Sequence, residues 1–200
     1  TIPSGYTALT KTVTQVGNYL TWNPNHHNAT GTPTFRFGNT NRFQSGLNPG
    51  SGHFGTFGAA SGRYYFELKY NDTTHNNPVG VRWMGDLPNG NSGVQIDNVG
   101  DLYLEASLQN NGASLSNGDI IGFDMDLDND QISVYVNDVQ RGSTLDIAVN
   151  KPSEGHAFSV FNNDAGGRTD VTILARPNDW IFSPKGCLLY TSPSPRDRLK

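Results

Sequence analysis

Three aspartates alternate with apolar residues in the sequence GDIIGFDMDLDND, residues 118–130, and could form a row of carboxylates. Successive side chains of a β-strand point to opposite faces, so Asp124, Asp126 and Asp128 would share one face, about 6.6 Å apart. Retaining glycosidases hold two carboxyl groups about 5–5.5 Å apart, and grouped carboxylates can bind calcium. The third interpretation is that these residues form only the solvent-facing side of a strand.

The residue types argue against both chemical interpretations. No glutamate lies in this stretch, and Asp is one methylene shorter than the Glu that a sandwich glucanase places on its catalytic strand. A calcium loop wraps its ligands around the ion, whereas a flat strand presents them in a line. We therefore expect a non-enzymatic protein and keep a carbohydrate hydrolase as the weaker alternative.

The histidines show none of the spacings that metal sites use. The chain has five histidines, His26, His27, His53, His75 and His156, without an H-x-x-x-H or H-E-x-x-H pattern. The first two fall in NPNHHNAT, which is typical of a loop. The one cysteine lies in the C-terminal tail, and no phosphate-binding loop follows a strand and precedes a helix. We expect no metal and no cofactor.

Composition excludes two classes of partner. Charged residues make up 16% of the 200 residues, and the formal net charge is −4. A nucleic-acid-binding protein normally carries a basic field, so no nucleic-acid partner is expected. No run of 18 apolar residues occurs, so no membrane insertion is expected. The length is sufficient for one domain with a hydrophobic core.

Short strands separated by turn residues run through the chain. Glycine occurs 23 times and asparagine is almost as frequent, and both favour turns. No segment keeps a helical apolar period free of Gly and Pro. Strands are predicted at 18–22, 34–38, 52–60, 62–70, 78–84, 93–97, 101–107, 118–128, 131–138, 144–149, 156–161 and 169–176. This pattern predicts an all-β protein, either a sandwich or a barrel.

The pattern of residues 118–138 predicts a specific hairpin. With Asn129 and Asp130 as a two-residue turn, Asp128 would lie opposite Gln131 and Asp124 opposite Tyr135. Apolar residues then pair with apolar residues on one face, and polar residues with polar residues on the other. A one-residue shift would destroy this agreement, which is why the pattern determines the two faces.

The sequences SGRYYFELKY, VGVRW and NGDIIGFDMDLDNDQISVYVND resemble successive signatures of the SPRY (B30.2) domain, over about residues 19–182. The hairpin carries most of the match, with the residues Gly118, Asp119, Ile121, Gly122, Asp126, Leu127, Asp128, Asn129, Tyr135 and Asn137. Asp130 and Asp138 stand where the family usually has Gly. The resemblance implies an antiparallel two-sheet β-sandwich, a concanavalin A-like jelly roll of SPRY type, that binds partners through loops. It also implies a structural role for Glu67.

The two ends suggest a wider context. Residues 1–18 are expected to be a linker or the end of a preceding unit, residues 19–184 the sandwich, and residues 185–200 a truncated end with a disordered tail. IPSGYTAL, residues 2–9, is similar to stretches that close SPRY-like units in tailed-phage structural proteins. Residues 187–197, CLLYTSPSPRD, resemble a translated sequencing adapter. These likenesses favour a phage virion protein, such as a tail fibre or decoration protein.

Two loops offer side chains for recognition. Residues 84–93 follow Trp83, and residues 161–168 read FNNDAGGR; both are rich in Asn, Asp and Gly at a strand end, where loops carry function. The candidate ligand-binding residues are Trp83, Asp86, Asn89, Asn91, Asn162, Asn163, Asp164 and Arg168. The expected partner is a host-surface glycan or protein, with neighbouring virion proteins as further partners. The alternative for the two loops is that they are ordinary polar turns and that Trp83 is a core residue. A spacer unit without ligand and a cellular protein–protein adaptor remain alternative functions.

Overall fold

The computed structural model describes residues 20–28, 34–37, 41–44, 51–74, 76, 78–83, 93–148, 158–164, 169–174 and 179–185. Within these ranges, fifteen β-strands form two antiparallel sheets. The strands are β1 (Trp22–Asn28), β2 (Thr34–Arg36), β3 (Asn41–Gln44), β4 (Ser51–Ala59), β5 (Arg63–Tyr70), β6 (Val79–Trp83), β7 (Val94–Ile96), β8 (Leu102–Leu104), β9 (Ser107–Asn110), β10 (Ile120–Asp126), β11 (Gln131–Val136), β12 (Val139–Gln140), β13 (Leu145–Asp146), β14 (Phe158–Asp164) and β15 (Thr169–Leu174).

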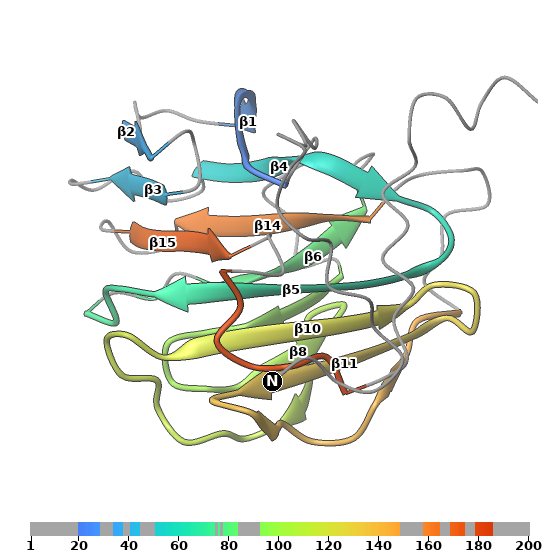
Figure 1. The fold of residues 1–200 in the computed structure, drawn as a ribbon. Coiled ribbons are helices and arrows are strands. Elements are labelled where there is room, and N and C mark those ends of the chain that lie inside the picture. Colours follow the sequence, from blue (N-terminus) through green and yellow to red (C-terminus); the bar gives the residue numbers. More distant parts are fainter. Residues whose placement is uncertain are drawn as a thin grey trace, which may run out of the picture.

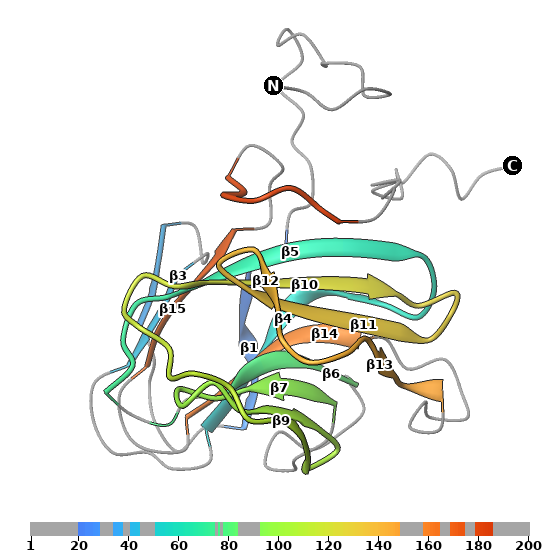
Figure 2. The same ribbon diagram turned by 90° about the horizontal axis from the view of Figure 1, so that it is seen from below.

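The two sheets form the layers of a sandwich (Figures 1 and 2). The first sheet has seven strands in the order β1-β4-β14-β6-β7-β8-β9. The second has the order β12-β11-β10-β5-β15-β3-β2, and its eighth strand, β13, pairs with β11. The expected all-β, two-sheet antiparallel sandwich is confirmed.

The core lies between the sheets and is built from alternate positions of each strand. Phe66 and Leu68 of β5 face Phe123 and Ile121 of β10, and all four side chains are buried. The rings of Phe66 and Phe123 stack with centroids 5.2 Å apart. Val79 and Val81 of β6, Val94 and Ile96 of β7, and Trp22 of β1 fill the other side of the same cluster. Burying such apolar surface is the main force that holds the sheets together.

The segment predicted as a single strand at 101–107 is instead a hairpin, so that prediction was wrong. β8 ends at Leu104, and Glu105 and Ala106 form a two-residue turn with φ of 49° and 64°. Left-handed conformations at both turn positions match the twist of the flanking strands. The Glu105 carboxylate accepts a hydrogen bond from the main-chain N–H of Gly93 at 2.7 Å, which fixes the turn against β7.

The hairpin of β10 and β11 has the predicted faces but not the predicted register. Asp126 pairs with Gln131 and Asp124 pairs with Ser133, two residues away from the expected pairing. The connection therefore has four residues, 127–130, rather than two. Leu127 in this turn is buried and its N–H donates to the Gly62 carbonyl at 2.9 Å. A shift of two residues leaves every side chain on its original face.

The first strand also differs from expectation. Residues 20 and 21 are not part of a strand, and β1 runs from Trp22 through the His26–His27 pair that was predicted to be a loop. Its register against β4 shifts between Trp22 and His27, where Pro24 lies. β1 is an edge strand, and proline is tolerated at edges and bulges because a main-chain donor is not needed there.

Candidate functional site

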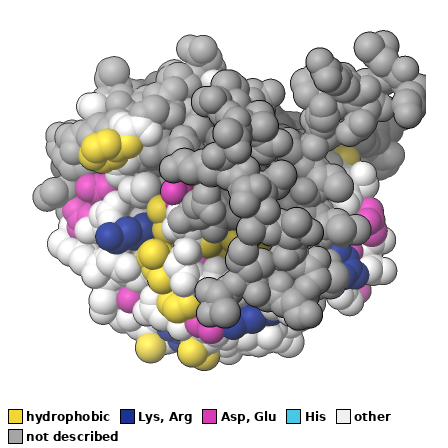
Figure 3. All heavy atoms as spheres, viewed as in Figure 1, with side chains coloured by type: hydrophobic (Ala, Val, Ile, Leu, Met, Phe, Trp, Pro, Cys, Tyr) yellow, Lys and Arg dark blue, Asp and Glu magenta, His cyan; other side chains and the backbone are white. Residues whose placement is uncertain are grey.

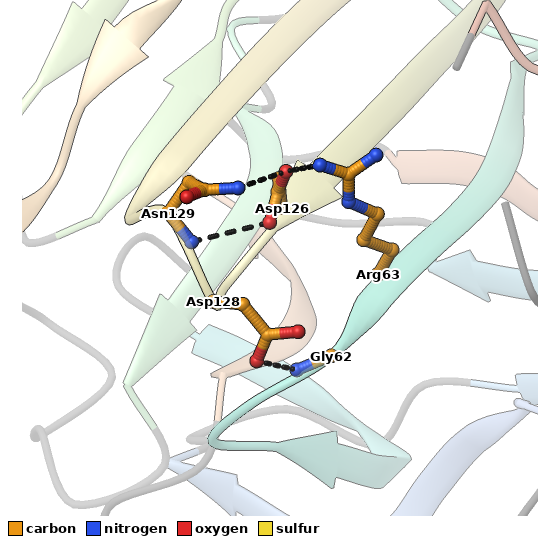
Figure 4. A network of polar contacts seen from close by, with 5 residues as sticks. All are labelled: Gly62, Arg63, Asp126, Asp128 and Asn129. Atoms are coloured by element: carbon orange, nitrogen blue, oxygen red, sulfur yellow. Dashed lines mark hydrogen bonds and ion pairs between the residues drawn. The ribbon is translucent and has the colours of Figure 1, made fainter. Parts of the chain in front are cut away.

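The carboxylates of Asp126 and Asp128 fix the turn between β10 and β11. Asp126 forms an ion pair with Arg63 of β5. Its oxygens also accept hydrogen bonds from the main-chain N–H of Asn129 at 3.1 Å and from the Asn129 side-chain amide at 2.8 Å (Figure 4). Burial alone would raise the pKa of Asp126, but the Asn129 hydrogen bonds and the Arg63 guanidinium together lower it.

Asp128 joins the same turn to the residue directly before β5. Its Oδ1 accepts a hydrogen bond from the main-chain N–H of Gly62 at 2.8 Å (Figure 4). The turn after β10 is thereby tied to the connection between β4 and β5. Two of the three carboxylates in the row are thus explained by structure, because Asp126 and Asp128 each accept hydrogen bonds from main-chain donors. Among the residues that the structure describes, no group of three or more His, Cys, Asp or Glu is placed to hold a metal ion.

A buried glutamate holds a segment across the outer face of the second sheet. Residues 179–185, which we call the strap, cross β5, β10 and β11 on the side away from the core (Figures 1 and 2). Glu67 is 0% exposed, and its carboxylate accepts hydrogen bonds from the N–H of Ile181 at 2.7 Å and of Phe182 at 2.8 Å. Lys185 forms an ion pair with Asp138 at the far end of the strap. Glu67 therefore has the structural role that the resemblance implied.

Tyr65 completes the contact between strap and sheet. Its hydroxyl donates to Glu67 Oε1 at 2.9 Å, and its ring meets Trp180 edge-on with centroids 5.0 Å apart. Burial, followed by the Glu67 carboxylate, raises the pKa of Tyr65 far above its usual value. A Cβ at Gly122 would lie 2.8 Å from the Tyr65 hydroxyl, so glycine is needed where β10 passes this side chain.

Four of the predicted ligand-binding residues lie in described strands, and they stand at two separate places along β14 and its neighbour β6. Trp83 pairs with Phe158 at the start of β14, whereas Asn162 pairs with Val79 near the end of that strand. The four-residue separation corresponds to about 13 Å along the strand. Asn163 and Asp164 continue β14 opposite Gly52 and Ser51 of β4. Asp86, Asn89, Asn91 and Arg168 lie outside the described residues. The two predicted loops thus begin at opposite ends of the first sheet.

Four loops from both sheets meet at the end where β14 finishes, on the left of Figure 1. They comprise residues 71–74, 97–101, 111–119 and 137–138, which we call the loop rim. Asn117 connects two of them: its Oδ1 accepts hydrogen bonds from the N–H of Thr73 at 2.8 Å and from its hydroxyl at 3.0 Å. Asn98 adds the third, because its amide donates to the Thr73 carbonyl at 3.2 Å. Side-chain amides therefore replace strand pairing in holding these loops together.

The fourth loop and the base of the rim are fixed in the same way. The Asn137 amide donates to Asp119 at 2.8 Å, and the Asn137 Oδ1 accepts from the N–H of Ile120 at 3.0 Å. Asn71 and Asn41 both donate to the Asp170 carboxylate, at 2.9 and 2.8 Å. The rim is consequently attached to β15 and β3 as well as to its own loops.

The turn of residues 97–101 and its main-chain contact with Gly112 fix the centre of the rim. Asp97 Oδ1 accepts hydrogen bonds from the N–H groups of Val99 at 3.1 Å and Asp101 at 2.9 Å. Burial, only partly offset by these bonds, raises the pKa of Asp97. A Cβ on Gly112 would lie 1.9 Å from the Gly100 carbonyl oxygen, so the two loops touch through bare main chain. The NVG hairpin signal at 98–100 is confirmed by this turn.

The rim loops contain acidic but no basic residues, although Asp138 pairs with Lys185 of the strap and Asp72 and Asp97 are buried. Five of its residues are acidic, Asp72, Asp97, Asp101, Asp119 and Asp138, and none is Lys or Arg. Val99, which is 45% exposed, adds an apolar side chain. The face seen in Figure 3 shows basic and acidic side chains in small separate groups, without one dominant sign among the residues that are coloured. Acidic charge is therefore a local property of the rim.

Comparison with known proteins supports the fold. The SPRY domain of human HERC1 matches with a TM-score of 0.58 and 15% identity, covering 78% of this chain and 98% of that one. The chain has the fold of a SPRY domain. The TRIM65 PSpry domain matches with a TM-score of 0.56 and 17% identity, covering 79% of this chain and 93% of that one. Stonustoxin matches with a TM-score of 0.56 and 18% identity over 78% of this chain, which spans only 27% of the stonustoxin chain.

Sequence comparison adds nothing to this SPRY fold. No protein-family model matches the chain, and no curated protein matches it. Within the described residues, no helix is long and apolar enough to cross a membrane.

Sequence reasoning missed most of the rim. Thr73, Asn98 and Asn117 lie in separate loops, and only the sheet topology brings them together. The usable signal was compositional, because each of these loops contains an asparagine at or next to a turn. Asparagine is favoured in turns because its side chain forms local hydrogen bonds. Nothing in the sequence therefore indicated that these asparagines also form hydrogen bonds between loops.

Proposed function

We propose that this chain is a non-enzymatic binding module whose loop rim recognises a protein partner with a basic surface. The observation that carries this proposal is the side-chain network that ties loops from both sheets into one exposed surface. Binding residues are concentrated on loops that a rigid scaffold positions. The likeness to SPRY domains supports a binding module rather than an enzyme.

Preorganisation is the physical advantage of such a rim. Ordering flexible loops during association costs about 0.5–1.5 kcal/mol for each immobilised side chain. In this chain Asn117, Asn98 and Asn137 already hold their loops in place through bonds of 2.8–3.2 Å. A partner therefore meets a surface whose donors and acceptors are already fixed.

The acidic charge indicates the chemistry of the partner. Complementary charge steers association and suppresses wrong partners more than it adds affinity. The rim loops contain five aspartates and no Lys or Arg. Lys185 pairs with Asp138 and Arg141 donates to the Ala113 carbonyl, so the aspartates still outnumber the neighbouring cations and would attract Lys and Arg side chains on the partner. The exposed Val99 gives an apolar contact in the middle of this acidic surface.

A peptide array displaying basic and acidic sequences tests this proposal with the full chain as probe. We expect binding to basic peptides that weakens with salt and is lost in Asn117→Ala, which releases Thr73. Gln131→Ala is the matched control, because Gln131 is exposed at the opposite end of the sandwich. Equal loss in both variants, or binding that ignores peptide charge, would contradict the assignment to the rim.

The finer proposal is that the chain belongs to a phage virion, as a tail-fibre or decoration domain, and that its partner is a protein or glycan on the host surface. Its support is the resemblance of residues 2–9 to phage repeat units and the amide-rich composition of residues 161–168. Tail or capsid genes beside this gene would support it, and a eukaryotic gene with introns would contradict it. A glycan array that stays silent across host envelopes would favour a protein ligand or a spacer.

A further inference from the structure

Two Asn-Gly dipeptides lie in the described part of the rim, Asn111-Gly112 and Asn117-Gly118. Glycine has no Cβ, so its main-chain nitrogen can approach the side chain of the preceding residue more easily than any other residue's can. An asparagine before glycine can therefore cyclise, because that nitrogen reaches the Asn Cγ and closes a five-membered ring. The surroundings of the two dipeptides differ sharply.

Asn111 has an exposed side chain, and a carboxylate lies beside the attacking atom. It is exposed, and no hydrogen bond to its amide is found among the described residues. The main-chain N–H of Gly112 donates to the Asp101 carboxylate at 3.2 Å. This distance is within the reach of a general base, so the proton that must leave the nitrogen already faces an acceptor.

Asn117 has the opposite arrangement. Its Oδ1 accepts two hydrogen bonds from Thr73, so the side chain cannot turn freely toward its neighbour. The main-chain N–H of Gly118 donates to the Tyr70 carbonyl at 2.6 Å. A carbonyl oxygen is a poor proton acceptor compared with a carboxylate, so this nitrogen stays protonated and engaged.

We propose that Asn111 is a site of spontaneous deamidation, assisted by Asp101, and that Asn117 is protected by the fold. The Gly112 nitrogen attacks Cγ of Asn111 while its proton passes to an Asp101 oxygen. The Cγ–Nδ2 bond then breaks, and the amide nitrogen takes up that proton and leaves as ammonia. Water opens the resulting succinimide at either carbonyl, which gives aspartate or isoaspartate at position 111. No oxidant or metal is required.

The modification lies beside Gly112, where two loops of the rim are in close main-chain contact. Isoaspartate adds one methylene to the main chain directly before Gly112. Gly112 is so close to Gly100 that even a Cβ would lie 1.9 Å from the Gly100 carbonyl oxygen. The inserted atom therefore separates the loop of residues 97–101 from that of residues 111–119, and the new carboxylate increases the acidic charge. Both effects follow from the chemistry at this site, whether or not the rim binds a partner.

Ageing of the full chain at mildly alkaline pH tests the proposal. Peptide mapping by mass spectrometry, with an isoaspartyl methyltransferase assay, gives the conversion rate of each asparagine. We expect Asn111 to convert well before Asn117 in the folded chain. In concentrated urea the two dipeptides should convert at similar rates, so the ratio of folded to unfolded rates isolates the effect of structure.

Two variants separate the parts of the mechanism. Asn111→Gln should abolish isoaspartate at this position, because the longer side chain would have to close a larger ring. Asp101→Asn should slow the conversion of Asn111 by about an order of magnitude or more, as expected for loss of a general base. An unchanged rate in Asp101→Asn would refute the role of Asp101. Equal conversion of Asn111 and Asn117 in the folded chain would refute the site itself.

Discussion

Replacing Glu67 with glutamine should loosen the strap without creating a cavity. The carboxylate accepts three hydrogen bonds, from the Tyr65 hydroxyl and from the N–H groups of Ile181 and Phe182. Glutamine has a single acceptor oxygen, and its NH₂ group would face an N–H donor. If the oxygen keeps the position of Oε1, the bond to Ile181 at 2.7 Å is lost.

The expected destabilisation follows from the strength of this bond. Hydrogen bonds to a charged group contribute about 1.5–3 kcal/mol, and the donor left behind is partly buried. Glu67→Gln should therefore lower the free energy of unfolding by about 1.5–3 kcal/mol. For a domain of this size that corresponds to a decrease in Tm of roughly 3–12 °C. Lys69→Gln is the matched control, since Lys69 is exposed on the same strand and should change stability by less than about 0.5 kcal/mol.

Urea unfolding measures the stability, and amide hydrogen exchange locates the change. In Glu67→Gln the amide of Ile181 should exchange faster than in the parent chain, while the β10 amides lose only the protection that the global destabilisation removes. Unchanged protection at Ile181, or a stability equal to that of the parent chain, would refute the role of Glu67 as the anchor of the strap.

Three further predictions concern the sandwich and its turns. Gly122→Ala should destabilise the protein by about 1–3 kcal/mol in urea unfolding, because the new Cβ displaces the Tyr65 hydroxyl, and the cost should shrink in a Tyr65→Phe background. The Asp126 carboxyl should titrate below its ordinary value of 3.8 in an NMR experiment, so its contribution to stability is complete above that pH and is lost as pH falls through the folded-state pKa. Arg63→Ala should raise that midpoint, and an unchanged midpoint would contradict the ion pair. Asp128→Ala should speed exchange of the Gly62 amide while changing stability by less than about 1 kcal/mol, because the bond is exposed.

The alternation of apolar and polar residues was sufficient to predict the sandwich and the faces of its main hairpin. The register of that hairpin was not predictable in this way, because a shift of two residues conserves the faces. What decided it was a side chain: Asp126 accepts two bonds from Asn129 and so closes a four-residue turn. Asp128, which was predicted to lie opposite Gln131, is in fact a residue of that turn.

Other features left no trace in the sequence for a physical reason. The partners of Glu67 at positions 181 and 182 are main-chain N–H groups, which every residue except proline possesses. No residue type therefore marks the contact. The resemblance to SPRY domains indicated a structural role for Glu67, but neither the strap nor the place where it crosses the sheet followed from it. The loop rim was hidden similarly, since its residues are brought together only by the pairing of distant strands.

The strap makes completion of this fold depend on residues that follow all fifteen described strands in the sequence. The bonds of Glu67 to the strap span 114 and 115 residues, so both sheets can emerge from a ribosome before these donors for the carboxylate exist. Until then Glu67 has only the Tyr65 hydroxyl and water as donors, and the nascent domain should stay open to chaperones and proteases. An expression boundary drawn at Leu174, where β15 ends, would preserve that state permanently. A boundary beyond Lys185 gives the sheet its closing contacts.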